Sequence, residues 1–243
     1  MNRTLLASLI GAAMVLAPGM GHAPAQNADA AAHGPTAARP AAGAKPEVSF
    51  AFERVGLAVP SFTLTISEDG HGIYKGRQVS SATNSATALT SADEFDRKFP
   101  VSAETVRKIF GLADRLHRFN VPCASKAKNI ADTGKKTLTF SGPDGATSCT
   151  YNFTENKDVQ SLTDVFQGIA ETLDQGRSLD HLHRYDRLGL DAALEFLTQE
   201  VTAGHALEIG TIETSLRSIA GDADVMQRVR TRANALLARV PAD

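Results

Sequence analysis

The chain has 243 residues, of which 42% are hydrophobic and 21% are charged, and its 25 basic side chains nearly balance its 27 acidic ones. This composition is typical of a globular protein with one large core or two small ones, and it excludes a nucleic-acid-binding protein that relies on a basic surface. Beyond the N-terminal segment no run of about 18 apolar residues occurs, so no transmembrane segment is predicted.

Residues 1–25 have the pattern of a secretory signal peptide. Arg3 supplies the positive charge, an apolar run follows it, and Ala23 and Ala25 are the small residues that precede a cleavage site. The alternative is an uncleaved N-terminal anchor, but no stop-transfer pattern follows. We therefore predict a periplasmic or extracellular protein. Residues 26–46, rich in Ala and Pro, are predicted to be a disordered tether because they cannot bury a core.

The chain contains two cysteines, Cys123 and Cys149. In an oxidising compartment an even pair favours a disulfide over a catalytic thiol or a metal site. Two unpaired buried thiols are the alternative, because the sequence does not supply the Cα separation that a disulfide requires.

Apolar residues alternate with polar ones from Glu47 onward, which predicts β-strands joined by Asp-Gly turns. The expected strands run through residues 48–52, 62–66 and 73–74 and, in a second hairpin, through 137–140 and 149–153. Residues 80–92 are rich in Ser, Thr and Ala and are predicted to form a loop, with a short edge strand as the alternative.

After each hairpin the apolar residues recur at helical spacing. The first helix is expected to begin at the cap Ser102 and to reach Leu116, and the second to run from Val159 to Leu173 and to end at Gly176. From Ser178 onward every pattern is helical.

These elements predict an α+β fold. Two hairpin-plus-helix units form one antiparallel sheet whose apolar face is covered by helices, and a C-terminal all-helical bundle follows. The two units are either a true duplication or the same hairpin pattern arising twice. The predicted division is a signal peptide at 1–25, a tether at 26–46, an α+β domain at 47–177, and a bundle at 178–243 that docks on it because its own core is small.

No catalytic, cofactor or metal site is recognisable. His181 and His183 are two residues apart in a helical pattern, so their rings point in different directions, and no further ligands lie nearby in the sequence. Neither of the nucleophile motifs GxSxG and SxxK occurs. A catalytic site assembled from distant residues is the alternative, with His71, His117 and Asp132 as its candidates.

The segment 123–136 is basic in an otherwise acidic chain, and a disulfide would restrict it as many binding loops are restricted. The residues of this candidate binding loop are Lys126, Lys128, Lys135 and Lys136. The alternative is a solvated loop whose lysines protect a sheet edge from aggregation.

The run Phe62-Thr63-Leu64-Thr65-Ile66, followed by Asp69-Gly70 and Tyr74-Lys75-Gly76, resembles a known hairpin pattern. It is similar to the YxLxI…DG…YxG hairpin of a family of small secreted bacterial proteins of unknown function. The resemblance covers residues 47–175, with Phe62 in place of the usual tyrosine and without the cysteines that often precede the strand. It implies a secreted α+β module and no activity.

Taken together, these patterns predict a secreted or periplasmic, non-enzymatic binding module that acts on an unidentified partner such as a cell-envelope protein. The alternatives are a cell-envelope hydrolase with a site built from scattered residues, and an inhibitor of an envelope enzyme. Neither a nucleic acid nor a cofactor is expected as a ligand. Binding would use the basic loop, an open sheet edge, or a groove between bundle and sheet.

Overall fold

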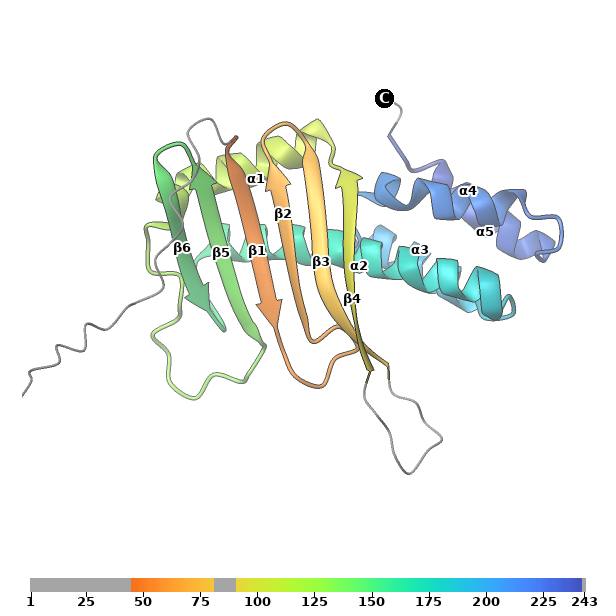
Figure 1. Ribbon diagram of the computed structural model, residues 1–243, viewed down its shortest axis with the longest axis horizontal. Coiled ribbons are helices and arrows are strands. Elements are labelled where there is room, and N and C mark those ends of the chain that lie inside the picture. Colours follow the sequence, from red (N-terminus) through yellow and green to blue (C-terminus); the bar gives the residue numbers. More distant parts are fainter. Residues whose placement is uncertain (1–44, 81–90, 242–243) are drawn as a thin grey trace, which may run out of the picture. The chain divides into compact units, whose positions relative to one another are not determined.

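The computed structural model describes residues 45–80 and 91–241 (Figure 1). The predicted signal peptide, most of the predicted tether, and most of the predicted loop at 80–92 lie outside these residues. No helix within the described residues is long and apolar enough to cross a membrane.

Six strands form one antiparallel sheet in the order β4-β3-β2-β1-β5-β6. The strands are β1 (Glu47–Glu53), β2 (Ser61–Ser67), β3 (His71–Ser80), β4 (Ser91–Pro100), β5 (Lys135–Gly142) and β6 (Gly145–Tyr151). The first four strands follow one another as a meander, and β5 returns to pair with the free side of β1, so the first strand of the chain is central in the sheet.

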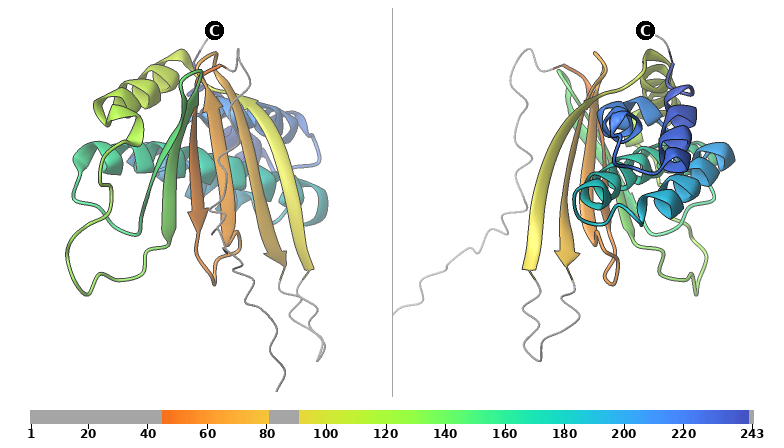
Figure 2. Two further views of the ribbon diagram at one scale, coloured as in Figure 1. Left: turned by 60° about the vertical axis from the view of Figure 1, so that its left-hand side comes forward. Right: turned by 90° about the vertical axis from the view of Figure 1, so that its right-hand side faces the viewer.

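Two helices cover one face of the sheet, and the remaining helices form a bundle that continues from the second of them (Figures 1 and 2). The α-helices are α1 (Ala103–Arg115), α2 (Lys157–Tyr185), α3 (Leu190–Ala203), α4 (Glu213–Gly221) and α5 (Gln227–Leu237), and the short 3-10 helices are η1 (His117–Phe119) and η2 (Ile209–Ile212). The predicted α+β architecture is therefore confirmed.

The alternation of the strands decides which side chains enter the core. Val48, Phe50, Leu64 and Ile66 project toward the helices and are fully buried, because successive side chains of a strand point to opposite faces. A second apolar cluster begins at Leu179, near the end of α2, and fills the bundle. The sheet and the bundle thus have separate cores that share one helix.

The prediction that the second helix ends at Gly176 is wrong, because α2 continues to Tyr185. Gly176 is needed inside the helix for close packing. A Cβ at this position would lie 2.3 Å from Cγ2 of Ile212, which belongs to η2. The glycine therefore lets the bundle approach α2, and the expected domain boundary at 177 falls within a continuous helix.

The predicted loop at 80–92 is wrong at its two ends, because Ser80 belongs to β3 and residues 91–92 belong to β4. The edge strand given as the alternative is present as β4, but it lies mostly beyond residue 92. Its exposed residues between 93 and 98 are mostly charged, which hides the period-two pattern of a strand. Phe95 and Phe99 nevertheless alternate with them, and their rings cover Gly76 and Gly72 of β3.

Glu208 joins the bundle to the start of α1. Its carboxylate accepts hydrogen bonds from the backbone N–H of Ser102, at 3.0 Å, and from the Ser102 hydroxyl, at 2.6 Å. Ser102 is also the predicted helix cap, since its hydroxyl accepts from the backbone N–H of Thr105. A carboxylate is favoured here because the N-terminus of a helix carries a partial positive charge.

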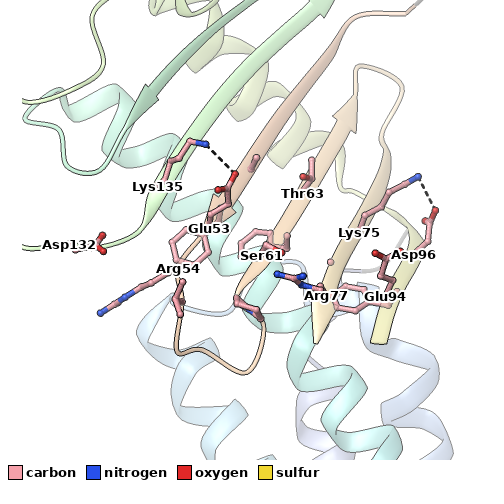
Figure 3. Close-up of a pocket in the computed structure, with 17 residues that line it drawn as sticks. Glu53, Arg54, Ser61, Thr63, Lys75, Arg77, Glu94, Asp96, Asp132 and Lys135 are labelled. Carbon is pink, nitrogen blue, oxygen red and sulfur yellow. Dashed lines mark hydrogen bonds and ion pairs between the residues drawn. The ribbon is translucent and has the colours of Figure 1, made fainter. Parts of the chain in front are cut away.

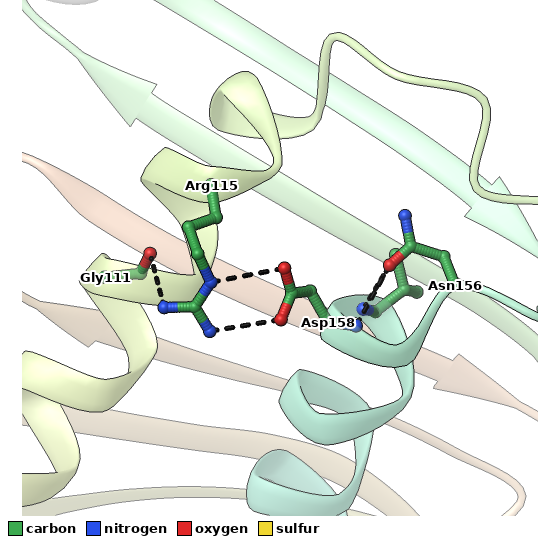
Figure 4. A network of polar contacts seen from close by, with 5 residues as sticks. Gly111, Arg115, Asn156 and Asp158 are labelled. Carbon is green, nitrogen blue, oxygen red and sulfur yellow. Dashed lines mark hydrogen bonds and ion pairs between the residues drawn. The ribbon is translucent and has the colours of Figure 1, made fainter.

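Arg115 and Asp158 connect the end of α1 with the start of α2 (Figure 4). The Nε and Nη2 atoms of Arg115 donate to the two carboxylate oxygens of Asp158 at 3.2 and 3.1 Å. Asn156 caps the same turn of α2 by accepting from the backbone N–H groups of Asp158 and Val159. This bidentate contact holds the pKa of Asp158 below its ordinary value.

We expect the variant Asp158→Asn to be less sensitive to acid than the wild type. Because the folded-state pKa of Asp158 is lowered, its ionised form stabilises the fold above the ordinary value of 3.8, and this contribution is lost as the pH falls through the lowered pKa. Urea unfolding at neutral pH and below pH 3.8 measures this loss. Asp180→Asn, at an exposed position of α2, is the control that should retain the wild-type pH dependence, and equal dependence in all three proteins would contradict the prediction.

Candidate functional site

The face of the sheet that points away from α1 and α2 is open and rich in hydroxyl groups (Figure 2, right). Two cross-strand contacts illustrate its character. The hydroxyls of Ser49 and Thr65 lie 2.9 Å apart, and those of Thr137 and Thr150 lie 3.0 Å apart. Within the described residues no helix covers this face, on which Thr150 is exposed and Ser49, Thr65 and Thr137 are half-buried.

One end of the open face is hollowed, where β1 and β2 are connected (Figure 3). The hollow has a volume of ≈ 1310 Å³. Its charged and hydroxyl-bearing lining residues are Glu53, Arg54, Ser61, Thr63, Lys75, Arg77, Glu94, Asp96, Asp132 and Lys135. A hollow of this size is large enough for a peptide segment or a small molecule.

Four of the eight charged residues that line the hollow are held in ion pairs across neighbouring strands. Lys135 of β5 contacts Glu53 of β1 at 3.3 Å, and Lys75 of β3 contacts Asp96 of β4 at 3.1 Å. Within the described residues Arg77 forms no ion pair, although Glu94 is its register partner on β4, and the same is true of Arg54, Glu94 and Asp132. The guanidinium of Arg77 extends from β3 across the hollow toward β2, where its register partner is Ser61 (Figure 3).

The rim of the hollow is the connection between β1 and β2, residues 54–60, which exposes apolar side chains. Val55 is 96% exposed and Leu57 is 41% exposed. The connection is nevertheless anchored, because the backbone N–H of Arg54 donates to the carbonyl of Pro60 at 2.8 Å and that of Val79 to the carbonyl of Ala58 at 2.9 Å. The rim is therefore an ordered turn that exposes Val55 to solvent.

On the helix side of the same connection a second hollow of ≈ 960 Å³ lies against α2. Three of its polar residues, Gln78, Asp174 and Arg177, belong to one hydrogen-bond network. The hydroxyl of Tyr74 donates to Asp174 at 3.0 Å, and Arg177 donates to the other oxygen of Asp174 at 3.1 Å and lies over the ring of Phe95. Gln78 accepts a further hydrogen bond from Arg177. The network fastens α2 to β3 and β4.

Burial has the largest effect on the pKa values of Tyr74 and Asp174 in this network. It raises the pKa of the Tyr74 hydroxyl and, despite the hydrogen bond from Tyr74 and the charge of Arg177, also that of the Asp174 carboxyl. A buried tyrosine with a raised pKa is not a base at neutral pH. We therefore assign these residues to stability.

The two cysteines are bonded to each other, as the sequence predicted. Cys123, in the segment after η1, and Cys149, in β6, form a disulfide with an S–S distance of 2.00 Å and a Cα–Cα distance of 5.8 Å. The bond attaches the segment 120–134 to the sheet.

The four lysines of the candidate binding loop have different environments. Lys126 and Lys128 are exposed, and Lys135 belongs to the open face through its contact with Glu53. The prediction that Lys136 belongs to an exposed basic loop is wrong, because its side chain is only 6% exposed.

The ammonium of Lys136 organises the turn that precedes β5. It donates to the carbonyl oxygens of Thr133, Gly134 and Asn152 at 3.0 to 3.1 Å, and it lies 5.7 Å from the ring centre of Phe52. Burial lowers its pKa, with a smaller contribution from Arg54. This lysine is a structural residue.

His71, His117 and Asp132 are not brought together. His71 pairs with Asp69 beside the β2–β3 turn, and η1, which contains His117, adjoins the β5–β6 turn through the Arg118–Asp144 ion pair. Four strand spacings of about 4.8 Å separate β3 from β6. Asp132 precedes β5 and lies at the opposite end of the strands, about 20 Å away along a strand of this length. Within the described residues no three metal-binding side chains cluster.

The sequence reasoning missed Arg77 and Ser61 as candidate binding residues. The period-two pattern places both on the face opposite Leu64, but it does not show which charged residues of that face find partners. No known protein-family model matches the chain, and none of the curated proteins compared with it is significantly similar in sequence.

Proposed function

We propose that this protein is an exported, non-enzymatic binding module that captures a partner protein of the cell envelope in the hollow on the open face of its sheet. The observation that carries the proposal is Arg77. Its guanidinium extends toward Ser61 on β2 and, among the described residues, forms no ion pair even with its β4 register partner Glu94, whereas the lysines of the same hollow are paired. A carboxylate of the partner would supply the missing counter-ion.

The rim suggests the second half of the recognition. Val55 is almost fully exposed and lines the same hollow as Arg77 and Ser61. Burying such a side chain contributes roughly 1.5 to 3 kcal/mol to association. The expected partner segment therefore carries an acidic side chain close to an apolar one.

Binding is favoured over catalysis by the composition of the hollow. Among the described residues its lining includes no histidine and no cysteine. Two of its four carboxylates, Glu53 and Asp96, are held by lysines, whereas Glu94 and Asp132 form no ion pair. A hydroxyl such as that of Ser61 needs an adjacent base to act as a nucleophile.

Export is supported by the disulfide and by the N-terminal pattern. An inhibitor of an envelope enzyme would differ from this proposal only in its partner.

The test is charge reversal in the hollow. We expect Arg77→Glu to reduce capture of the partner from an envelope extract by about tenfold or more, because it removes a charge-assisted hydrogen bond and repels the carboxylate. Arg107→Glu makes the same change on the exposed side of α1 and should leave capture unchanged. Quantitative mass spectrometry of the captured proteins measures both.

Two further variants decide between surfaces. A photo-crosslinking residue in place of Thr63, on the open face beside the hollow, should label the same partner that Arg77→Glu loses. The double variant Lys126→Glu/Lys128→Glu tests the exposed part of the basic loop. If this double variant loses the partner while Arg77→Glu retains it, binding belongs to the loop and the proposal for the hollow is refuted.

A further inference from the structure

The sheet has two edge strands, β4 and β6, and their outer backbone groups have no strand to pair with among the described residues. Such an edge is a template for pairing with another chain, so natural proteins protect it with charges, proline or a covering segment. The two edges of this sheet are protected to very different degrees.

The register shows which residues direct their backbone groups outward. In an antiparallel sheet every second residue of an edge strand does so, and Pro100, which has no N–H to donate, marks the outward set of β4. This set consists of Ala92, Glu94, Asp96, Lys98 and Pro100, so from residue 94 onward it contains three charged residues and a proline. The edge at β4 is therefore closed to further strands.

The edge at β6 has none of these features. The hairpin closes with Gly142 opposite Gly145, so the outward set of β6 consists of Ala146, Ser148 and Thr150. All three are exposed, and β6 contains neither a charged residue nor a proline.

The neighbouring segment leaves this edge free. The disulfide holds Cys123 to Cys149, a residue of β6 whose side chain is buried on the helix side of the sheet. In the left-hand view of Figure 2, α1 and the loop that follows it lie to the helix side of β6. No segment within 45–80 or 91–241 is hydrogen-bonded to the outer backbone groups of β6.

We propose that β6 pairs in antiparallel fashion with β6 of a second copy of this chain, so that two sheets become one. A two-fold axis at Ser148, the central residue of β6, would place Ala146 opposite Thr150 of the second copy. All residues in this pairing are small and uncharged, so no like charges meet, and hydroxyl pairs across strands are favourable. Pairing of β6 with β4 of another copy, which would build open-ended fibres, is blocked by the charges and the proline of β4.

The experiment is sedimentation equilibrium on the exported form of the chain. We expect a reversible dimer. We also expect Ser148→Pro to raise its dissociation constant by about tenfold or more, because the substitution removes a backbone donor from each of the two copies that meet at the axis. Lys98→Pro makes the corresponding change at the β4 edge and should leave the dimer intact.

Ser148→Lys, which keeps the backbone donor but adds a charge on the axis, should also dissociate the dimer, and circular dichroism confirms that the variants are folded. A wild-type protein that is monomeric up to roughly 1 mM, where even weak interfaces assemble, overturns the proposal. So does a dimer that both β6 variants leave intact, or one that Lys98→Pro disrupts as strongly as they do.

Discussion

Replacing Lys136 with methionine is expected to lower the free energy of unfolding by about 3 kcal/mol, since hydrogen bonds to a charged group contribute more than neutral ones and unpaired buried acceptors are costly. Methionine retains most of the apolar length of the side chain. The ammonium, however, is the common donor to the carbonyl oxygens of Thr133, Gly134 and Asn152. Chemical denaturation followed by circular dichroism measures the change.

The neighbouring residue supplies the control. Lys135→Met is the same substitution one position earlier, on the open face, where the ammonium has only the exposed contact with Glu53. Exposed ion pairs of this kind contribute about 0 to 1 kcal/mol. Faster hydrogen exchange around residues 131–134 in Lys136→Met alone would locate the damage, whereas equal losses in the two variants would contradict the structural role of Lys136.

Removing the disulfide is expected to have an effect of similar size. For the loop between Cys123 and Cys149, which are separated by 26 positions, the chain-entropy description gives a loss of about 3.5 kcal/mol in the double variant Cys123→Ala/Cys149→Ala. The bond limits the conformations of segment 123–149 in the unfolded chain. Urea denaturation is the appropriate measurement, because its midpoint shifts with stability.

A reducing agent provides the matched comparison for the disulfide. The wild type under reducing conditions should approach the stability of the double variant, and the variant itself should not respond to the reductant. A double variant as stable as the oxidised wild type would show that the bond contributes nothing. If exchange protection is lost first in the segment 120–134, the bond also holds that segment against the sheet.

The local elements of this fold could be predicted from the sequence because their signals are local. Alternation around Phe50 and Leu64 and helical spacing around Val106 depend only on residues a few positions apart. The same is true of the cap at Ser102. The α+β class follows from the order of these elements, and the disulfide from the number of cysteines and the expected compartment.

Prediction failed where a residue takes its role from a distant part of the chain. The glycine signal at Gly176 indicated a helix end, but the residue is required by the close approach of Ile212. Charged residues concealed β4, whose strand character depends on pairing with β3. Neither partner is within reach of a pattern read along a few neighbouring positions.

The candidate site shows the same division. Composition and periodicity alone established an apolar face, a polar face and a basic segment. The different roles of the two neighbouring lysines depend on tertiary packing: Lys135 is exposed and pairs with Glu53, whereas Lys136 is buried and donates to the carbonyl of Asn152. The same packing leaves Arg77 without an ion pair among the described residues. The physical reason is that a charged side chain forms an ion pair or a hydrogen bond only with groups that the folded chain brings within a few ångströms of it. In this protein those groups come from strands and turns that are distant in the sequence.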